Sequence, residues 1–350
     1  MICPRCHRRP EDDALFCPFD GERLVDAIEI KRIRSKPTEL HGTVFGGRYQ
    51  VRGLVGKGAM AQVLLALDQK TGAPVAVKLL DPRHVADKRL VARFLQEATA
   101  AAQVVHRSIV DMLDVGIGDG GAPYLVMEYL HGESLADWLV REKAMGPAMG
   151  MAFVRQVAEG LAAVHRAGIV HRDLKPDNVF LLGEKKEPHA AKIVDFGFAK
   201  LDDRGALTQA GVAVGTVEYM SPEQAVSDPV DARSDVYGLG VLMYRLFTGR
   251  LPFTGKDPSA ILARHLLQEP APPAIAGALG PGLAAIVQKA MRKRPEHRYA
   301  SMEALLGDLA CLDRGEPLAA RFAPDAPDVY VPRTEFSVKA SEFLRRKLGP

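Results

Sequence analysis

The sequence predicts an α+β protein in which a β-rich region precedes a mainly helical region. Two runs rich in β-forming residues, 49–55 and 62–67, flank a glycine turn. Farther along the chain, apolar residues recur at helical spacing, as in residues 149–167. In addition, three of the four cysteines lie within the first seventeen residues. These observations together predict a small N-terminal unit, then a strand-rich part and a helical part.

The composition is that of an ordinary soluble globular protein and argues against several functions. Of the 350 residues, 47% are hydrophobic and 25% are charged, which leaves enough apolar material for a core. The formal net charge of +3 is too small to favour nucleic acid or a membrane surface as a partner. No run of eighteen apolar residues appears, and the N-terminus MICPRCHRRP has no apolar signal region. We therefore expect a cytoplasmic protein with no membrane span in this chain.

The N-terminal segment contains Cys3-Pro4-Arg5-Cys6 and Cys17-Pro18-Phe19-Asp20-Gly21. With these two motifs the segment 1–25 resembles a zinc ribbon, in which two tight turns each present a pair of ligands. A segment this short cannot bury enough apolar surface to fold unaided, so a metal would supply the missing free energy. Asp20 stands where a ribbon normally has its fourth cysteine, and His7 is the competing fourth ligand, since structural zinc sites prefer sulfur and imidazole to carboxylate. The alternative is a disordered arm with spare thiols. The expected zinc ligands are Cys3, Cys6, Cys17 and Asp20.

The stretch HRDLKPDN, residues 171–178, carries the strongest chemical signal, and the motif Asp-Phe-Gly follows it, beginning at Asp195. Phosphoryl transfer depends on positioning and charge neutralisation more than on covalent help from the protein. Asp173 can accept the proton of a hydroxyl group, and Lys175 can offset charge on the moving phosphoryl group. Asn178 and Asp195 can share the metal ions. One motif alone would be weak, whereas the two at this spacing are specific.

Through these motifs the chain resembles the bacterial, eukaryotic-like serine/threonine protein kinases over residues 45–313. The resemblance implies the two-lobed protein kinase fold, with a β-rich N-lobe and one regulatory helix at 45–130 and a mainly helical C-lobe at 131–313. Residues 26–44 contain a basic run closed by proline and are expected to form a linker. Residues 314–350 contain several prolines and scattered charged residues and are expected to form a flexible tail.

The resemblance also implies a reaction and partners. The enzyme would transfer the γ-phosphoryl group of ATP, bound with Mg²⁺ or Mn²⁺, to Ser and Thr hydroxyl groups of proteins. It would also phosphorylate its own activation segment in bacterial signalling, which implies that copies of the chain associate with one another. Nucleic acid is not expected as a partner.

The glycine turn would hold the triphosphate. A strand follows it, as in protein kinases, whereas a dinucleotide site or a P-loop would place a helix there. Glycine lets backbone amides approach phosphate oxygens without a side chain between them. Ala61 stands at the third glycine of the family pattern, and its methyl group is expected to stiffen the loop without blocking it. The residues of this turn expected at the nucleotide are Val55, Gly56, Lys57, Gly58, Ala59, Met60, Ala61, Gln62 and Val63.

A lysine and a glutamate would fix the phosphates. Lys78 ends an apolar strand, and Glu97 falls on the helix predicted at 88–104, where the family pairs a glutamate with that lysine. Met127 corresponds to the gatekeeper position, and the backbone from Glu128 to Leu130 would meet the adenine edge. The apolar surfaces on the two sides of adenine would come from Val55, Val63, Ala76 and Phe180.

The activation segment would run from residue 195 to residue 223. Lys175 together with Thr216 resembles the serine/threonine branch of the family, in which Thr216 would brace the catalytic residues. Arg172 precedes the catalytic aspartate, which in the family marks kinases whose activation segment is ordered by phosphorylation. A phosphate group carries roughly −1.5 to −2 charges, enough to recruit such an arginine. Thr208 is the best candidate acceptor, and the alternative is an ordinary polar loop threonine.

Three further residues are expected to be structural. Glu223 would form a buried ion pair with Arg298 that ties the activation segment to a late helix. Asp235 resembles the helix-borne aspartate that holds the backbone of the catalytic loop.

Two other classes of protein compete with an active protein kinase. A pseudokinase scaffold would be expected to have lost Lys78, Asp173 or Asp195, and all three are present. A small-molecule phosphotransferase would carry the same HxDxxxxN motif but would lack the activation segment.

Overall fold

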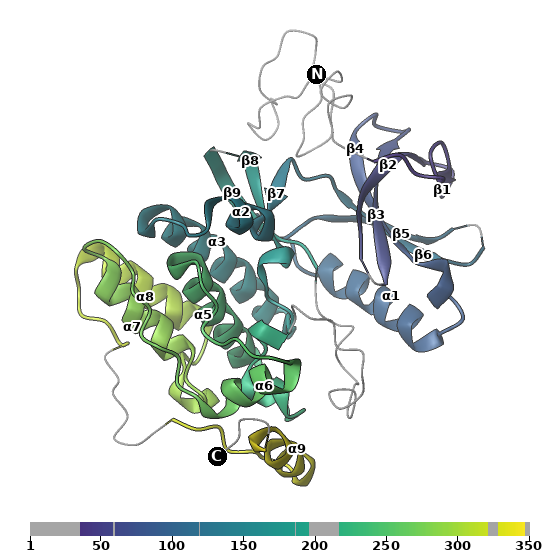
Figure 1. Cartoon of the computed structure of the whole chain (residues 1–350). Coiled ribbons are helices and arrows are strands. Elements are labelled where there is room, and N and C mark those ends of the chain that lie inside the picture. The colour runs from purple at the N-terminus through teal and green to yellow at the C-terminus, as the bar shows by residue number, and fades with distance from the viewer. Residues whose placement is uncertain are drawn as a thin grey trace. The chain divides into compact units, whose positions relative to one another are not determined.

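The computed structural model of the chain describes residues 36–58, 60–118, 120–185, 187–195, 217–320 and 328–346, without the side chains of residues 97, 98, 100 and 101. These residues form two compact units, most of whose strands and α-helices are labelled in Figure 1. The N-terminal unit comprises the residues up to Val105 and Val110–His131. The C-terminal unit comprises His106–Ile109 and the residues from Gly132 onward. Outside the described residues lie the candidate zinc ligands, Ala59, Thr208 and Thr216.

The N-terminal unit is built around a six-stranded sheet in the order β1-β2-β3-β4-β6-β5. All of its strand pairs are antiparallel. Neighbouring strands follow one another in the sequence except β4 and β6, between which a helix and β5 intervene. The strands are β1 (Val44–Phe45), β2 (Tyr49–Lys57), β3 (Ala61–Asp68), β4 (Pro74–Leu80), β5 (Met112–Ile117) and β6 (Pro123–Glu128). After β4 come the short 3₁₀ helix η2 (Pro82–His84) and the helix α1 (Lys88–Ala102).

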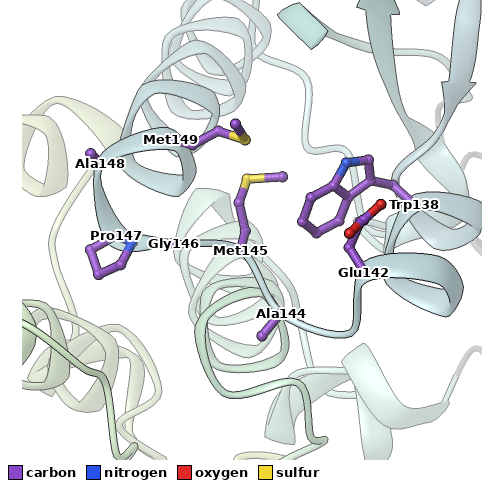
Figure 2. Close-up of a pocket in the computed structure, with 8 residues that line it drawn as sticks. All are labelled: Trp138, Glu142, Ala144, Met145, Gly146, Pro147, Ala148 and Met149. Carbon is purple, nitrogen blue, oxygen red and sulfur yellow. The ribbon is translucent and has the colours of Figure 1, made fainter. Parts of the chain in front are cut away.

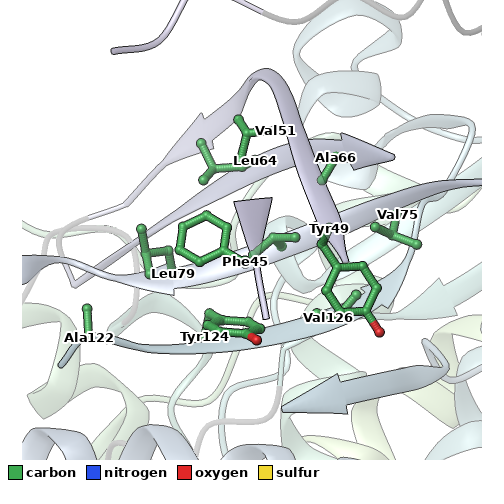
Figure 3. Packing of buried hydrophobic residues seen from close by; sticks show 11 residues of the cluster. Phe45, Tyr49, Val51, Leu64, Ala66, Val75, Leu79, Ala122, Tyr124 and Val126 are labelled. Atoms are coloured by element: carbon green, nitrogen blue, oxygen red, sulfur yellow. The ribbon is translucent and has the colours of Figure 1, made fainter. Parts of the chain in front are cut away.

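One face of this sheet carries an apolar core, shown in Figure 3. Leu64, Val77 and Val126 are fully buried there, because side chains at every second position of a strand point to the same face. Phe45 joins them, with its ring centroid 5.1 Å from that of Tyr124. The core fixes the register of the strands, since a shift by one residue would move these side chains to the other face.

The opposite face of the sheet packs against α1. Leu80 and Leu125 cluster with Phe94 of that helix, and all three side chains are buried. Val91 lies three residues before Phe94, on the same side of the helix, and packs against the same cluster. Since side chains alternate along a strand, Lys78 lies on the same face as Leu80. The apolar contacts therefore fix α1 to the face of the sheet that carries Lys78.

The C-terminal unit is mainly helical and is arranged around α5 (Ala232–Thr248). Nearly all residues of α5 are buried, as expected for a helix enclosed on all sides. The Asp231 side chain accepts a hydrogen bond from Arg233 N at its start, and Gly249, with a φ of 71°, ends it. No helix among the residues described in either unit is long and apolar enough to span a bilayer.

The other elements of the C-terminal unit are further helices, of which α3 is the longest, and a small sheet. The α-helices are α2 (Leu135–Glu142), α3 (Pro147–Arg166), α4 (Pro222–Ala225), α6 (Pro258–Leu267), α7 (Gly280–Ala290), α8 (Met302–Arg314) and α9 (Glu335–Arg345). The 3₁₀ helices are η3 (Pro176–Asn178), η6 (Val217–Tyr219) and η7 (Pro295–His297). The sheet has the order β7-β8-β9, with β7 (Gly132–Ser134), β8 (Val179–Glu184) and β9 (Glu187–Ile193).

Residues 328–346, here called the C-terminal strap, are docked on this unit, where the sequence predicted a flexible tail. Tyr330 is 2% exposed, and its hydroxyl donates a hydrogen bond to Asp228 Oδ2 at 2.8 Å. At the other end of the strap, Leu344 of α9 joins the buried apolar cluster that includes Leu262 and other residues of α6. The structure differs from the expectation because the strap contacts residues far earlier in the chain, such as Asp228, which lies 102 positions before Tyr330, and no local pattern reveals such contacts.

Buried polar contacts hold the first part of the strap. Asp328 Oδ2 accepts a hydrogen bond from Lys293 N at 2.5 Å, and Asp328 Oδ1 lies 3.0 Å from His297 Nδ1. The Lys293 side chain is itself buried, with its Nζ 4.3 Å from the ring centroid of Phe253. Burial lowers the pKa of Lys293 to about 7, and the Asp328 carboxylate opposes this shift. The strap thus supplies a negative charge beside a buried lysine.

Two positions on α9 test the docking of the strap. Leu344→Ala removes a side chain that is 5% exposed, so it is expected to lower the free energy of unfolding by about 2–5 kcal/mol. Val338→Ala, at a position that is 43% exposed on the same helix, is expected to change it by less than about 0.5 kcal/mol. Urea unfolding followed by circular dichroism measures both variants. Equal and small effects would mean that α9 is not docked in solution.

Candidate active site

Asp235 of α5 fixes the backbone of the catalytic loop, residues 171–175. Asp235 Oδ2 accepts a hydrogen bond from His171 N and Oδ1 accepts one from Arg172 N, both at 2.8 Å. His165 Nε2 lies 2.7 Å from Asp235 Oδ2. Burial disfavours the charged carboxylate, but the bonds from His165 and Arg172 N hold the pKa of Asp235 below its ordinary value. These contacts are those expected for the role that the sequence suggested for Asp235.

His171 orients the backbone amide group of Asp173. The ring is completely buried, and its Nδ1 accepts a hydrogen bond from Asp173 N at 3.3 Å. Burial lowers the pKa of His171, so the neutral ring keeps Nδ1 available as an acceptor. We therefore assign His171 to positioning of the loop and not to proton transfer with a substrate.

Three side chains with predicted catalytic roles lie together. Lys175 Nζ is 3.2 Å from Asp173 Oδ2. Asn178 Nδ2 donates to the Asp173 carbonyl oxygen at 2.8 Å and approaches Asp173 Oδ2 at 3.3 Å. The Asp173 and Lys175 side chains remain 16% and 19% exposed. A carboxylate that a substrate hydroxyl can reach is able to accept its proton.

The two expected magnesium ligands lie at the open end of the β8–β9 hairpin, since Asn178 directly precedes β8 and Asp195 follows β9 by two residues. Val194 N donates to the Asn178 carbonyl oxygen at 3.0 Å, so Asp195 follows directly on a residue bonded to Asn178. The Asn178 amide nitrogen is used by Asp173, which leaves its side-chain oxygen as the atom for a cation. Mg²⁺ prefers oxygen ligands and usually takes one or two from the protein, the rest coming from phosphate and water. The residues present therefore fit a magnesium ion.

In the N-terminal unit, the predicted nucleotide residues share one face of the sheet. Val63 pairs with Lys78 across β3 and β4, and Ala76 pairs with Met127 across β4 and β6. Residues opposite one another in antiparallel strands point to the same face. This is the face that packs against α1, the helix that carries Glu97. The side chain of Glu97 lies outside the described part of the chain, so its pairing with Lys78 stays a prediction.

The glycine turn leaves room for a phosphate group. Gly58 N donates to the Ala61 carbonyl oxygen at 2.8 Å, which closes the turn between β2 and β3. A Cβ atom built on Gly56 would meet no atom within 4 Å. Open space beside a glycine backbone is what a triphosphate needs to approach amide groups. The described part of the turn is therefore compatible with ATP.

The connection after β6 is fixed by Glu128. Glu128 Oε1 accepts a hydrogen bond from Asp111 N at 2.8 Å, and Glu128 N donates to the Asp111 carbonyl oxygen at 3.0 Å. These bonds anchor the start of the segment whose backbone is predicted to meet adenine. Phe180, predicted to lie on the other side of adenine, is on β8 of the C-terminal unit. The nucleotide contacts that involve both units stay a prediction.

Glu223 and Arg298 form a buried ion pair. Two parallel bonds of 2.7 and 2.8 Å join the guanidinium group to the carboxylate, and Ser234 Oγ donates a third bond to it at 2.5 Å. Burial disfavours the carboxylate, but Arg298 holds the pKa of Glu223 below its ordinary value. Arg298 also donates to the backbone carbonyl groups of residues 233, 292 and 293. The pair therefore connects α4 with the start of α5 and with the segment before η7.

Loss of the arginine tests how much this pair contributes. Arg298→Met leaves the buried carboxylate of Glu223 without its charged partner and is expected to lower the free energy of unfolding by about 3–5 kcal/mol. Arg314→Met removes a surface partner of Glu316 and is expected to leave the midpoint of urea unfolding nearly unchanged. If both variants unfold at the midpoint of the parent protein, the buried pair does not stabilise the fold.

Two contacts in this site were not predicted. His165 binds the Asp235 carboxylate, and the Gln224 side chain donates to the carbonyl oxygen of Arg172 at 2.7 Å. The spacing Ser221-x-x-Gln224 was visible as a capping box and is one in the structure. That signal predicts only the start of a helix, so the second partner of Gln224 could not be inferred from it.

An open pocket of about 430 Å³ lies where α2 leads into α3, as Figure 2 shows. The side chains of Trp138, Met145 and Met149 point toward it, and the carboxylate of Glu142 lies beside the indole ring. None of the predicted site residues lines this pocket. It therefore has no part in the candidate active site.

Residues 49–309 match the protein kinase domain family. The match covers well over half of the chain, so the protein belongs to this family, and the family and fold predicted from the sequence are confirmed.

Several proteins similar to this chain are bacterial serine/threonine-protein kinases. The chain is 38% identical over 283 residues to serine/threonine-protein kinase pkn3 of Myxococcus xanthus, an alignment that covers 79% of this chain and 52% of that protein. It is 37% identical over 300 residues to serine/threonine-protein kinase PknB of Mycobacterium tuberculosis, covering 84% of this chain and 46% of PknB. The chain thus spans about half the length of these relatives. The crystal structure of the PknI kinase domain of Mycobacterium tuberculosis matches with a TM-score of 0.61 and 27% identity, over 79% of this chain and 100% of that one.

Proposed function

We propose that this chain is an active serine/threonine protein kinase of the cytoplasm, which phosphorylates proteins and its own activation segment with ATP. The observation that carries the proposal is the grouping of Asp173, Lys175 and Asn178 on a loop whose backbone is bonded to a buried aspartate. These residue types supply the proton acceptor, the positive charge and the metal ligand that phosphoryl transfer requires. The activity is proposed on this arrangement and on the family.

In the proposed mechanism, Asp173 orients the acceptor hydroxyl and takes its proton as the oxygen forms a bond to the γ-phosphorus. Lys175 offsets the negative charge on the group in transfer. Asn178 and Asp195 would hold Mg²⁺ or Mn²⁺, which neutralises phosphate charge when bound. Thr216 would brace Asp173 and Lys175.

The N-terminal unit would bind the nucleotide. Lys78, held by Glu97, would contact the α- and β-phosphates, and the backbone of the glycine turn would cover the triphosphate. Met127 would stand behind the adenine ring, and the backbone from Glu128 to Leu130 would bond its edge. The open space beside Gly56 and the shared face of Val63, Ala76 and Lys78 support this assignment.

An inactive scaffold is the second candidate that the sequence raised. Such a protein would be expected to lack one of three charged groups, yet Lys78, Asp173 and Asp195 are all present. A small-molecule phosphotransferase would lack an activation segment. In this chain the end of that segment, at Glu223 of α4, is anchored by the buried ion pair with Arg298, which supports a protein kinase.

Two neighbouring aspartates, one in the catalytic loop and one on η3, test the proposed role of Asp173 as the proton acceptor. Asp173→Asn removes the proton acceptor and is expected to lower kcat by about 10²–10⁴-fold. Asp177→Asn, an exposed aspartate four residues later, is expected to retain activity. Transfer of labelled phosphate from ATP to a generic basic protein measures both, with Lys78→Met as a third, inactive variant. Full activity of Asp173→Asn or of Lys78→Met would count against the proposal.

Phosphorylation of Thr208 would order the activation segment through Arg172. Thr208→Ala is expected to lower activity, whereas Thr208→Ser, which retains a hydroxyl group, is expected to keep most of it. Mass spectrometry of the protein after incubation with ATP identifies the modified residue. Because copies of the chain would phosphorylate one another, the rate per molecule should rise with protein concentration. Unchanged activity of a protein that carries no phosphate on Thr208 would remove this switch.

The segment 1–25 is proposed to bind one zinc ion through Cys3, Cys6, Cys17 and either Asp20 or His7. The described residues contain no group of three His, Cys, Asp or Glu side chains that could hold a metal, so bound zinc would report on this segment. Metal analysis of the full chain is expected to return about one zinc per molecule. Cys17→Ser should lose the metal, whereas Cys311→Ser, which changes a free cysteine of α8, should retain it. A parent protein without zinc would contradict the assignment.

A further inference from the structure

We propose that Gln224 is a positioning residue, which aims Asp173 by holding the peptide group between Arg172 and Asp173. This inference rests on the proposed kinase function. Gln224 Nε2 donates to the Arg172 carbonyl oxygen at 2.7 Å, although the two residues are 52 positions apart. Gln224 lies on α4, so this bond joins the helix at the end of the activation segment to the catalytic loop.

The backbone of Arg172 needs a contact of this kind. Its φ is 67°, in the left-handed region that residues with a Cβ atom adopt only at a cost. Asp235 Oδ1 holds the N–H group of Arg172 at 2.8 Å, and Gln224 holds its carbonyl group. Both sides of the strained residue are therefore fixed. Without Gln224, the peptide group that leads into Asp173 would keep the 3.3 Å bond from Asp173 N to His171 Nδ1 but lose the bond to its oxygen, and could turn more easily toward an unstrained conformation.

The orientation of the Gln224 amide follows from its two partners. Its oxygen accepts a hydrogen bond from Ser221 N at 3.0 Å, and a backbone N–H group can only donate. Its nitrogen must then face the Arg172 carbonyl oxygen, which can only accept. Each half of the amide thus has one suitable partner, and turning the amide over would break both bonds.

The backbone around Gln224 is fixed, as its side-chain amide group is. The neighbouring Glu223 is locked by its bonds to Arg298, and Ser221 caps the first turn of α4. A half-buried side chain on such a short, anchored helix has little freedom to follow a moving loop. The Asp173 amide is fixed on its other side by His171 Nδ1. Gln224 and His171 therefore fix the peptide group that leads into Asp173, and Lys175 and Asn178 contact its carboxylate.

Gln224→Glu separates this role from capping. Glutamate keeps an oxygen for Ser221 N and forms the usual capping box, but it places an acceptor against the Arg172 carbonyl oxygen. We expect kcat to fall by about tenfold or more, equivalent to ~1.4 kcal/mol in the barrier. The KM for ATP should stay within about twofold, because the nucleotide contacts are untouched. Gln224→Met, which has no donor, should show the same division between kcat and KM.

Ser221→Ala is the matched control. It removes the hydroxyl group that accepts from Gln224 N but leaves the amide in contact with Arg172. This variant should melt at a lower temperature than the parent, as expected for a lost cap, and should keep a kcat close to that of the parent. A loss of kcat in Ser221→Ala equal to that in Gln224→Glu would overturn the proposal, because general weakening of α4 would then explain both.

Hydrogen exchange of the peptide that contains residues 171–175 gives a readout that needs no activity. In Gln224→Glu the amides of this loop should exchange faster than in the parent, with little change elsewhere. If the parent protein has no kinase activity but the loop exchanges faster in Gln224→Glu, the proposed kinase function is contradicted, whereas the role of Gln224 in fixing the loop is supported. An active parent whose variant shows unchanged kcat and unchanged exchange would sink the role of Gln224 alone.

Discussion

The buried carboxylate of Asp235 is the constraint on which the candidate active site depends. A charge enclosed within α5 is costly unless hydrogen bonds surround it. Two backbone N–H groups of the catalytic loop and the ring of His165 provide those bonds. If the loop moved away, the buried carboxylate of Asp235 would lose its two backbone hydrogen-bond donors. The Asp235 carboxylate therefore links the position of the catalytic loop to the buried helix α5.

Polar contacts, more than apolar packing, set the geometry of this site. Asp235 holds the amide side of the strained Arg172, Gln224 holds its carbonyl side, and His171 holds the amide of Asp173. The ion pair of Glu223 and Arg298 anchors the helix from which Gln224 reaches the loop. Directional bonds of this kind specify the orientation of a peptide group, which non-directional burial of apolar surface does not.

The family, the fold and the grouping of Asp173, Lys175 and Asn178 could be predicted from the sequence, because phosphoryl transfer demands particular residue types at fixed short spacings. The face that carries Val63, Ala76 and Lys78 follows from strand alternation. The bond from Gln224 to Arg172 could not be predicted, since a glutamine three residues after a serine signals only a cap. The docking of Tyr330 and Leu344 was missed for a similar reason, because a local pattern does not show which distant residues, here Asp228 and α6, a segment will contact.

The C-terminal strap also changes where this domain should be considered to end. The family match stops at residue 309, yet Tyr330 and Leu344 complete an apolar cluster with α6, and the Tyr330 hydroxyl donates a hydrogen bond to Oδ2 of the buried Asp228. A protein cut at the family boundary would present bare hydrophobic surface beside a carboxylate stripped of its hydrogen-bond donors. Such a surface favours self-aggregation, so recombinant expression and crystallisation should retain the sequence through α9.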